Sequence, residues 1–186
     1  GAIVVLLPIY NADGNEPMSP TNRAHQNGPA AVGVRANARG RDLNRDFIKV
    51  EEAETRALVA CFNEWDPHVF IDCHTTDGSY HRYGITYAGP KSPSGDQSLV
   101  TYARETFLPA LSLAVEASTG KPTFWYGSFE GEFDAGPRGH SRWETFPADA
   151  RFGTTYVGLR GRLSILSEAY VYDPFRERVE NTRNGT

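Results

Sequence analysis

The order of apolar and polar residues predicts short buried strands that alternate with helices. Runs of mostly apolar residues at about 2–9, 69–73 and 163–170 have the length of buried strands. Over 51–65, apolar residues recur every three or four positions, as on one face of a helix. The other predicted elements are a strand at 83–88, helices at about 98–117 and 154–162, and a helical tail from Asp173. This alternation indicates an α/β fold with a mixed, mainly parallel sheet flanked by helices.

The apolar run at the start of the chain, AIVVLLPI, bears on domain organisation. It is too short to cross a bilayer, and no positively charged stretch precedes it, so it is not a complete signal peptide. Its composition is that of a buried parallel strand, and domains seldom begin inside such a strand. We therefore expect 1–186 to form a single domain that is the C-terminal portion of a larger catalytic domain, incomplete at its N-terminus. The compartment is not indicated.

Two long stretches lack a regular pattern. The stretch from Asn11 to Arg41 holds several Gly and Pro residues, and a loop of this length in a compact domain usually has a function. The stretch 119–150 is rich in Gly, Pro and aromatic residues. It is either an irregular surface excursion or the wall of a pocket. In a pocket wall, Asp134 or Asp149 would favour a basic substrate side chain; the alternative is that both are solvated acids.

Composition excludes some partners. The 186 residues are 39% hydrophobic and 23% charged, and the formal net charge is −4. These values are ordinary for a globular protein, and no basic excess points to nucleic acid or to an anionic membrane surface.

Candidate chemistry begins with His74 and Glu168, each at or near the carboxyl end of a predicted strand. Ligands of open α/β sheets bind beyond these ends, so the shared position suggests that the two residues act together. Alone, a histidine after a strand is more often a hydrogen-bonded structural residue than a metal ligand.

The segment 33–47, GVRANARGRDLNRDF, contains four arginines. A solvated basic loop is one interpretation. However, Asp42, Asn44 and Arg45 lie within one turn, and an arginine beside an amide is suited to hold a carboxylate. Arg35 is a second guanidinium that would face an oxyanion.

These segments together resemble the zinc carboxypeptidases of the carboxypeptidase A type. Residues 11–14, Asn-Ala-Asp-Gly, resemble that family's Asn-Pro-Asp-Gly turn. Residues 35–47 are similar to its segment Arg-x-Asn followed by Gly-x-Asp-Leu-Asn-Arg-Asn-Phe. The strand ends at 72–74 and 166–168 resemble the places where the family carries its third zinc ligand and its catalytic glutamate. The order is the family's, and the segments cover nearly the whole chain.

The resemblance implies a role for each matching residue. His74 would bind zinc, and Arg45 and Asn44 would hold the terminal carboxylate of the substrate. Arg35 would polarise the scissile carbonyl and stabilise the oxyanion. Glu168 would be the general base for the zinc-bound water, whose pKa the metal lowers to about 7. The family's mobile tyrosine has two candidates, Tyr126 and Tyr156, and Asp42 is expected to support the loop.

The sequence departs from the family pattern in three places. Ala12 replaces a proline, and Asp46 replaces an asparagine found in many members. The family's first two zinc ligands come from a His-x-x-Glu motif upstream of the Asn-Pro-Asp-Gly turn, and this chain begins after that point. One histidine does not make a tight zinc site. We therefore expect one zinc ion in a longer protein and leave open whether this chain binds it.

The sequence thus predicts a zinc-dependent metallocarboxypeptidase-like hydrolase that acts on peptides with a free C-terminal carboxylate. One alternative is a deacylase or amidase on the same fold, acting on acyl-amino acids. Another is a non-catalytic relative that keeps Asn44 and Arg45 to bind carboxylates without zinc. Glu168 argues against the latter, because a binder has no need of an acid that faces a bound carboxylate.

Overall fold

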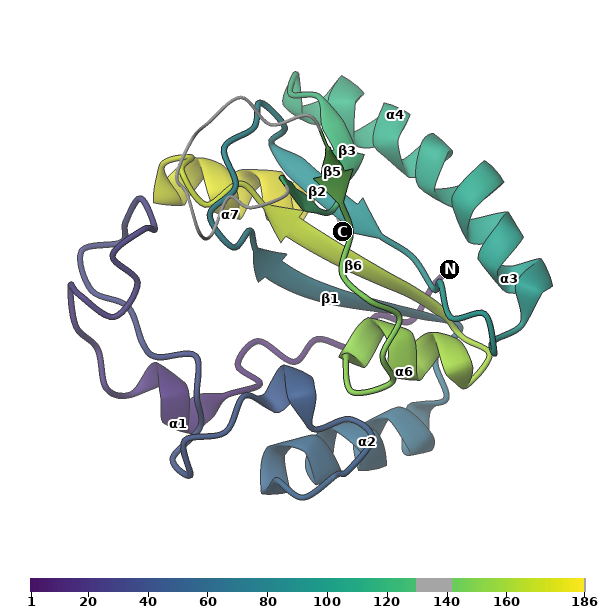
Figure 1. Cartoon of the computed structure of the whole chain (residues 1–186), viewed down its shortest axis with the longest axis horizontal. Helices are drawn as coiled ribbons and strands as arrows, with labels where there is room; N and C mark the ends of the chain where they lie inside the picture. Colours follow the sequence, from purple (N-terminus) through teal and green to yellow (C-terminus); the bar gives the residue numbers. More distant parts are fainter. Residues whose placement is uncertain (130–141, 186) are drawn as a thin grey trace.

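The main sheet has four strands in the order β1-β6-β2-β3. The structure is a computed structural model that describes residues 1–129 and 142–185. The strands are β1 (Val69–Thr75), β2 (Ile85–Ala88), β3 (Thr123–Trp125) and β6 (Leu163–Ala169). β1 is parallel to β6 and β2 is parallel to β3, whereas β2 and β6 are antiparallel. The sheet is therefore mixed and mostly parallel, with helices on both sides (Figure 1), as the sequence predicts.

Strand β6 explains how the two faces of the sheet differ. All seven of its residues are buried, as expected for a strand with a neighbour on each side. Alternate residues of a strand point to opposite faces. Ile165 and Ala169 belong to apolar clusters that include residues of helix α4 (Leu108–Thr119). Ser164 instead donates a hydrogen bond to the carbonyl of Thr154 in helix α6 (Gly153–Leu159), at 2.7 Å. Glu168 shares the face of Ser164, and so points to the α6 side.

Helices cover both faces of the sheet (Figure 1). On one face, α4 (Leu108–Thr119) contacts β3 and α7 (Phe175–Asn184). On the other face, α6 (Gly153–Leu159) contacts β1 and β6. Helix α2 (Ala53–Trp65) also lies on this second face, since the ring of its Phe62 meets Phe70 of β1 edge-on, with centroids 6.3 Å apart. Among the described residues, no helix is long and apolar enough to cross a membrane.

The predicted helix at about 98–117 is confirmed as a continuous helical stretch. It consists of α3 (Gln97–Tyr102), a single π-helical segment (Ala103–Phe107) and α4. Asp96 begins it by accepting hydrogen bonds from the first backbone N–H groups. Gly120 ends it in the left-handed conformation, with a φ of 70°.

The expected strand at 2–9 is wrong. The segment has no regular structure, and Ile3 and Leu6 are 85% and 81% exposed. A strand requires a hydrogen-bonded neighbour, and none of the described strands pairs with this segment. The apolar run shows that the segment favours burial, but it does not supply the partner.

The stretch 11–41 is largely irregular, as expected. It contains one short helix, α1 (Ala12–Asn15), and an isolated bridge between Ser19 and Val32. Asn11 begins α1, and its side chain accepts a hydrogen bond from the backbone N–H of Gly14 at 3.0 Å. The stretch therefore has a defined path despite its many breakers.

The stretch 119–150 holds more regular structure than its composition suggests. Besides β3, it contains β4 (Ser128–Phe129) and β5 (Trp143–Glu144), which form a small antiparallel pair. Asp149 forms an ion pair with Arg151 at 3.1 Å. Asp134 lies outside the described residues.

Candidate functional site

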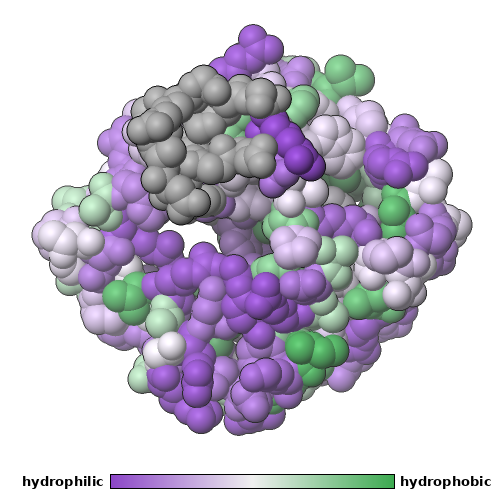
Figure 2. Space-filling view, viewed as in Figure 1, coloured by the Kyte–Doolittle hydropathy of each residue, from purple (hydrophilic) through white to green (hydrophobic). Residues whose placement is uncertain are grey.

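The carboxyl ends of β1 and β6 bring His74 and Glu168 side by side. The parallel register pairs these two residues directly, and adjacent strands lie about 4.8 Å apart. The charge of each side chain changes the pKa of the other. Figure 2 shows a hollow bordered by hydrophilic side chains, in the region where Figure 1 places the carboxyl end of β1.

His74 is held by a carboxylate on its own strand. Its ring nitrogen Nε2 lies 2.9 Å from Oδ2 of Asp72. Burial lowers the pKa of His74, but Asp72, with a smaller contribution from Glu168, outweighs burial and raises the pKa to about 9. The bond to Asp72 uses Nε2 and leaves Nδ1 as the nitrogen available to a ligand.

Glu168 is a buried carboxyl group with an unpaired oxygen. The residue is only 4% exposed, and within the described residues its Oε2 has no hydrogen-bond partner. Burial raises its pKa to about 8, although the charges of His74 and Arg35 oppose the rise. Buried polar atoms are normally paired, and perturbed carboxyl groups of this kind cluster at functional sites.

Asp42 orders the arginine-rich segment. Its side chain accepts a hydrogen bond from the backbone N–H of Asn44 at 3.0 Å and so begins the 3₁₀ turn η1 (Leu43–Arg45). The same carboxylate forms ion pairs with Arg35 at 2.8 Å and with Arg45 at 3.8 Å. Asp42 therefore supports the loop, as expected, and sets the positions of both guanidinium groups.

The turn that carries Asn44 and Arg45 is attached to the start of α6. Oδ1 of Asn44 accepts a hydrogen bond from the backbone N–H of Gly153 at 2.9 Å. The guanidinium of Arg45 lies 4.6 Å from the centre of the Phe152 ring, a favourable cation–π arrangement. Gly153 permits this contact, because a Cβ there would approach the Phe47 ring to 2.9 Å. Two segments far apart in sequence thus meet beside the sheet.

The charge of Arg35 acts both on this turn and on the residues at the strand ends. Its side chain is 49% exposed, yet its charge lowers the pKa of His74, Glu168 and Arg45. Such an influence falls off with distance and screening, so the loop and the strand ends belong to one site. The structure therefore brings together the residues on which the resemblance rests.

Of the two candidate tyrosines, the structure places Tyr126 beside Glu168. The hydroxyl of Tyr126 donates a hydrogen bond to Oδ2 of Asp77 at 3.2 Å. Burial raises the pKa of Tyr126 strongly, and the negative charges of Glu168 and Asp77 raise it further. Tyr156 instead packs its ring against Phe47, with centroids 5.8 Å apart. The only sequence signal for Tyr126 and Asp77 is that each closely follows a strand.

The described residues do not by themselves fit a zinc ion. His74 with Asp72 behind its ring has the make-up of one metal ligand. A zinc site in a hydrolase has three protein ligands, and the described part of the chain contains no group of three or more His, Cys, Asp or Glu side chains placed to hold a metal. His74 is therefore a single candidate ligand.

Comparison with solved structures identifies similar folds. The metallo-carboxypeptidase from Burkholderia cenocepacia superposes with a TM-score of 0.56 at 18% identity, over 82% of this chain and 38% of that chain. A putative carboxypeptidase A from Shewanella denitrificans gives 0.57 at 18% identity, over 82% and 40%. The metallo-carboxypeptidase from Pseudomonas aeruginosa, solved in complex with (2-guanidinoethylmercapto)succinic acid, gives 0.56 at 18% identity, over 82% and 39%.

This likeness establishes a carboxypeptidase-like α/β fold. No family model matches the sequence, and no curated protein matches it. The chain spans about two-fifths of the length of the solved structures that it resembles.

Proposed function

We propose that this chain is part of a peptide hydrolase of the metallocarboxypeptidase type, which removes residues from the C-terminus of peptides. The observation that carries the proposal is the pairing of His74 with Glu168 at one end of the sheet, next to a segment in which Asp42 orders two arginines, Arg35 and Arg45. A carboxyl group with an unpaired oxygen and a cationic turn are what hydrolysis next to a free carboxylate requires.

Arg45 and Asn44 are the proposed anchor for the terminal carboxylate of the substrate. Arg45 is only partly neutralised by Asp42, since that ion pair is long, at 3.8 Å, and Asp42 lies closer to Arg35. A planar guanidinium can hold both oxygens of a carboxylate. The Phe152 ring under Arg45 restricts its orientation, which reduces the entropy lost on binding.

Arg35 and Glu168 are the proposed reacting partners of the scissile bond. Arg35 would donate hydrogen bonds to the carbonyl oxygen as negative charge develops there. In its ionised form, which gains population as the pH rises through its pKa of about 8, Glu168 would accept a proton from the attacking water and deliver it to the leaving amine. Tyr126, which is partly buried beside Glu168, would cover the bound substrate.

We further propose that the metal is zinc, with His74 as one ligand and the remaining ligands from outside the described residues. The description of two of the neighbouring structures as metallo-carboxypeptidases supports a metal. The described residues supply one candidate ligand, His74, and no group of three that could hold the metal.

A deacylase or amidase that acts on acyl-amino acids is the second candidate. Such a substrate has the same free carboxylate, so the arginine-rich turn suits it equally well. A panel of peptides ending in Lys, Arg or Phe, each with a free and an amidated C-terminus, together with acyl-amino acids, separates the two when it is assayed with the zinc-loaded full-length protein. A carboxypeptidase cleaves the free peptides and spares the amidated ones, whereas equal rates on both would overturn the proposal.

The same panel tests the role of Glu168. Glu168→Gln keeps the shape of the side chain but removes its proton-accepting charge, and we expect hydrolysis to fall by about 10²–10⁴-fold. Glu64→Gln, an exposed change on α2, is the matched control and should retain the wild-type rate. Carboxylate binding without hydrolysis in the wild type would leave the non-catalytic relative as the function.

A further inference from the structure

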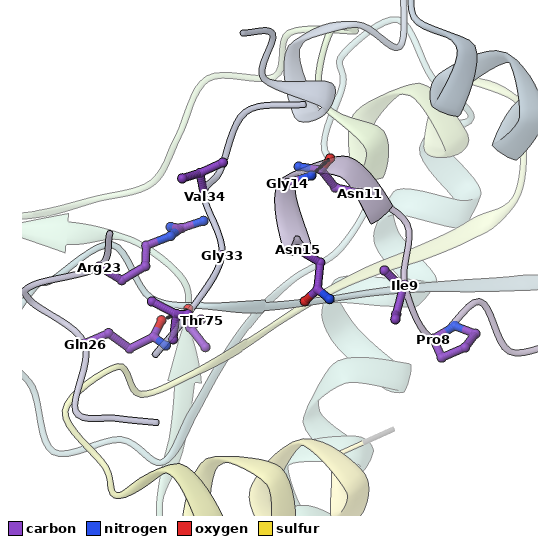
Figure 3. Close-up of a pocket in the computed structure, with 11 residues that line it drawn as sticks. Pro8, Ile9, Asn11, Gly14, Asn15, Arg23, Gln26, Gly33, Val34 and Thr75 are labelled. Carbon is purple, nitrogen blue, oxygen red and sulfur yellow. Dashed lines mark hydrogen bonds between the residues drawn. The ribbon is translucent and has the colours of Figure 1, made fainter. Parts of the chain in front are cut away.

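A second polar pocket adjoins the candidate site. It has a volume of about 280 Å³ and lies between the segment around α1, the loop from Arg23 to Val34 and the end of β1 (Figure 3). Thr75, which directly follows His74, forms part of its wall. In Figure 3, Arg23 and Gln26 lie on one side of the pocket, and Asn15 and Ile9 on the other.

The charge of the pocket is unbalanced. Arg23 is the only charged residue among those that line it. The side chain is partly buried, and within the described residues it makes no hydrogen bond and no ion pair. Burial lowers the pKa of Arg23, and the nearby positive charge of Arg35 lowers it further, against a smaller opposite effect of Asp42. A partly buried cation without an adjacent counter-ion favours the binding of an anion.

Close backbone packing and hydrogen bonds join the two loops that form much of the pocket wall. Gly33 lets the two loops meet, because a Cβ there would lie 2.2 Å from the carbonyl oxygen of Gly14. The next residue, Val34, donates its backbone N–H to that same carbonyl at 2.7 Å. Asn11 also donates a side-chain hydrogen bond to the carbonyl of Arg35 at 3.0 Å. A preformed pocket loses less entropy when it binds a ligand.

The remaining polar groups suit a small planar anion. The hydroxyl of Thr75 donates to Oε1 of Gln26 at 3.4 Å, and Nε2 of Gln26 donates to the carbonyl of Gly28 at 3.1 Å, which holds the Gln26 side chain in place. Asn15 is exposed to the pocket with an amide that can donate. No carboxylate lines the pocket to repel an anion.

We infer that this pocket is a carboxylate-binding subsite with Arg23 as its counter-ion, separate from the carboxylate anchor at Arg45. That the anion is part of a substrate rests on the proposed function. Such a substrate would bear a second carboxylate besides the one held at Arg45. Binding itself requires neither a metal nor turnover, so it is tested independently.

The test is a titration of the metal-free chain, in the presence of a chelator, with succinate as the probe. The side-chain Nε–H signals of the arginines, followed by NMR, report which guanidinium meets the anion. We expect the Arg23 signal to shift, and Arg23→Gln to weaken the affinity of this site by about tenfold or more, the size of a lost charge-assisted hydrogen bond. Arg41→Gln, an exposed change in the neighbouring segment, is the matched control and should bind as the wild type does.

An unshifted Arg23 signal, or wild-type affinity in Arg23→Gln, would overturn the inference. Thermal unfolding checks that Arg23→Gln is folded. If that variant does not fold, the Arg23 signal of the wild type decides, together with Arg23→Lys, which keeps the charge but not the planar fork and should bind less tightly. Succinate binding at Arg23, together with no peptide hydrolysis by the zinc-loaded full-length protein, would refute the proposed function alone. Peptide hydrolysis by the full-length protein, together with an Arg23 signal that does not shift on addition of succinate, would refute this inference alone.

Discussion

The imidazole Nε2 of His74 lies 2.9 Å from Oδ2 of Asp72, two residues earlier on β1. Residues two apart on a strand share a face, so the strand itself places the carboxylate next to the ring. The bond directs Nδ1 of His74 away from Asp72, as in metal sites where a carboxylate orients a histidine ligand. One short segment, Asp-Cys-His, thus encodes both a candidate ligand and the group that positions it.

Asp72→Asn should lower the pKa of His74. The Asp72 carboxylate is the strongest of the influences that raise this pKa to about 9, and burial, which lowers it, would remain. We expect a fall of about 1–3 units, measured by NMR titration of the imidazole in the metal-free chain. An unchanged His74 titration would show that Asp72 does not set its protonation.

Arg45→Ala should weaken substrate binding more than it slows the chemical step. The guanidinium is proposed to hold the terminal carboxylate in the ground state and the transition state alike, and loss of such uniform binding raises KM. We expect KM for a free-carboxylate peptide to rise about tenfold or more, with a smaller change in kcat. Arg41→Ala is the matched control. A variant whose KM equals that of the wild type would remove Arg45 as the anchor.

Asp46→Asn should destabilise the fold in a pH-dependent way. Oδ1 and Oδ2 of Asp46 accept hydrogen bonds from the backbone N–H groups of Glu51 and Glu52, directly before α2. Burial raises the pKa of Asp46, but these bonds outweigh it and hold the pKa below 3.8. Because the folded pKa is lower than the unfolded one, the stabilisation is present above pH 3.8 and is lost as the pH falls through the folded value.

We therefore expect Asp46→Asn to lower the free energy of unfolding by about 1–2 kcal/mol at pH 7, because asparagine has one acceptor oxygen and leaves one of the two backbone N–H groups without its charged partner. Chemical denaturation of wild type and variant at pH 7 and pH 3 measures this. The difference between the two proteins should shrink at the lower pH. A difference that does not depend on pH would mean that the charge of Asp46 contributes nothing beyond its shape.

The chain by itself should bind zinc weakly. The described residues offer His74 and no group of three potential ligands, and a single imidazole does not hold zinc tightly. Elemental analysis after dialysis against micromolar zinc should find well below one zinc per chain, and His74→Ala should remove most of what is bound. Stoichiometric, chelator-resistant zinc that depends on His74 would show that the chain supplies its own remaining ligands.

The local pattern of apolar and polar residues was sufficient to predict those helices and strands whose own residues show the pattern clearly. Helix α2 carries an apolar face, and β6 carries a mostly apolar run, so each was predicted close to its observed bounds. The pairing of His74 with Glu168 also followed, since the carboxyl ends of parallel strands meet at one edge. The role of Asp42 in supporting its loop was predicted because Asp42, Asn44 and Arg45 are neighbours in the chain.

Other features depend on contacts between distant segments, which no local pattern encodes. The strand expected at 2–9 fails because hydrogen-bonded pairing requires a partner, and apolar composition alone does not provide one. Tyr126 was separated from Tyr156 only when folding brought it to Asp77, 49 residues away. The sequence by itself determined the class of fold and the strand-end pair. The tertiary structure decided which tyrosine and which arginines surround that pair, because burial and electrostatics act through space rather than along the chain.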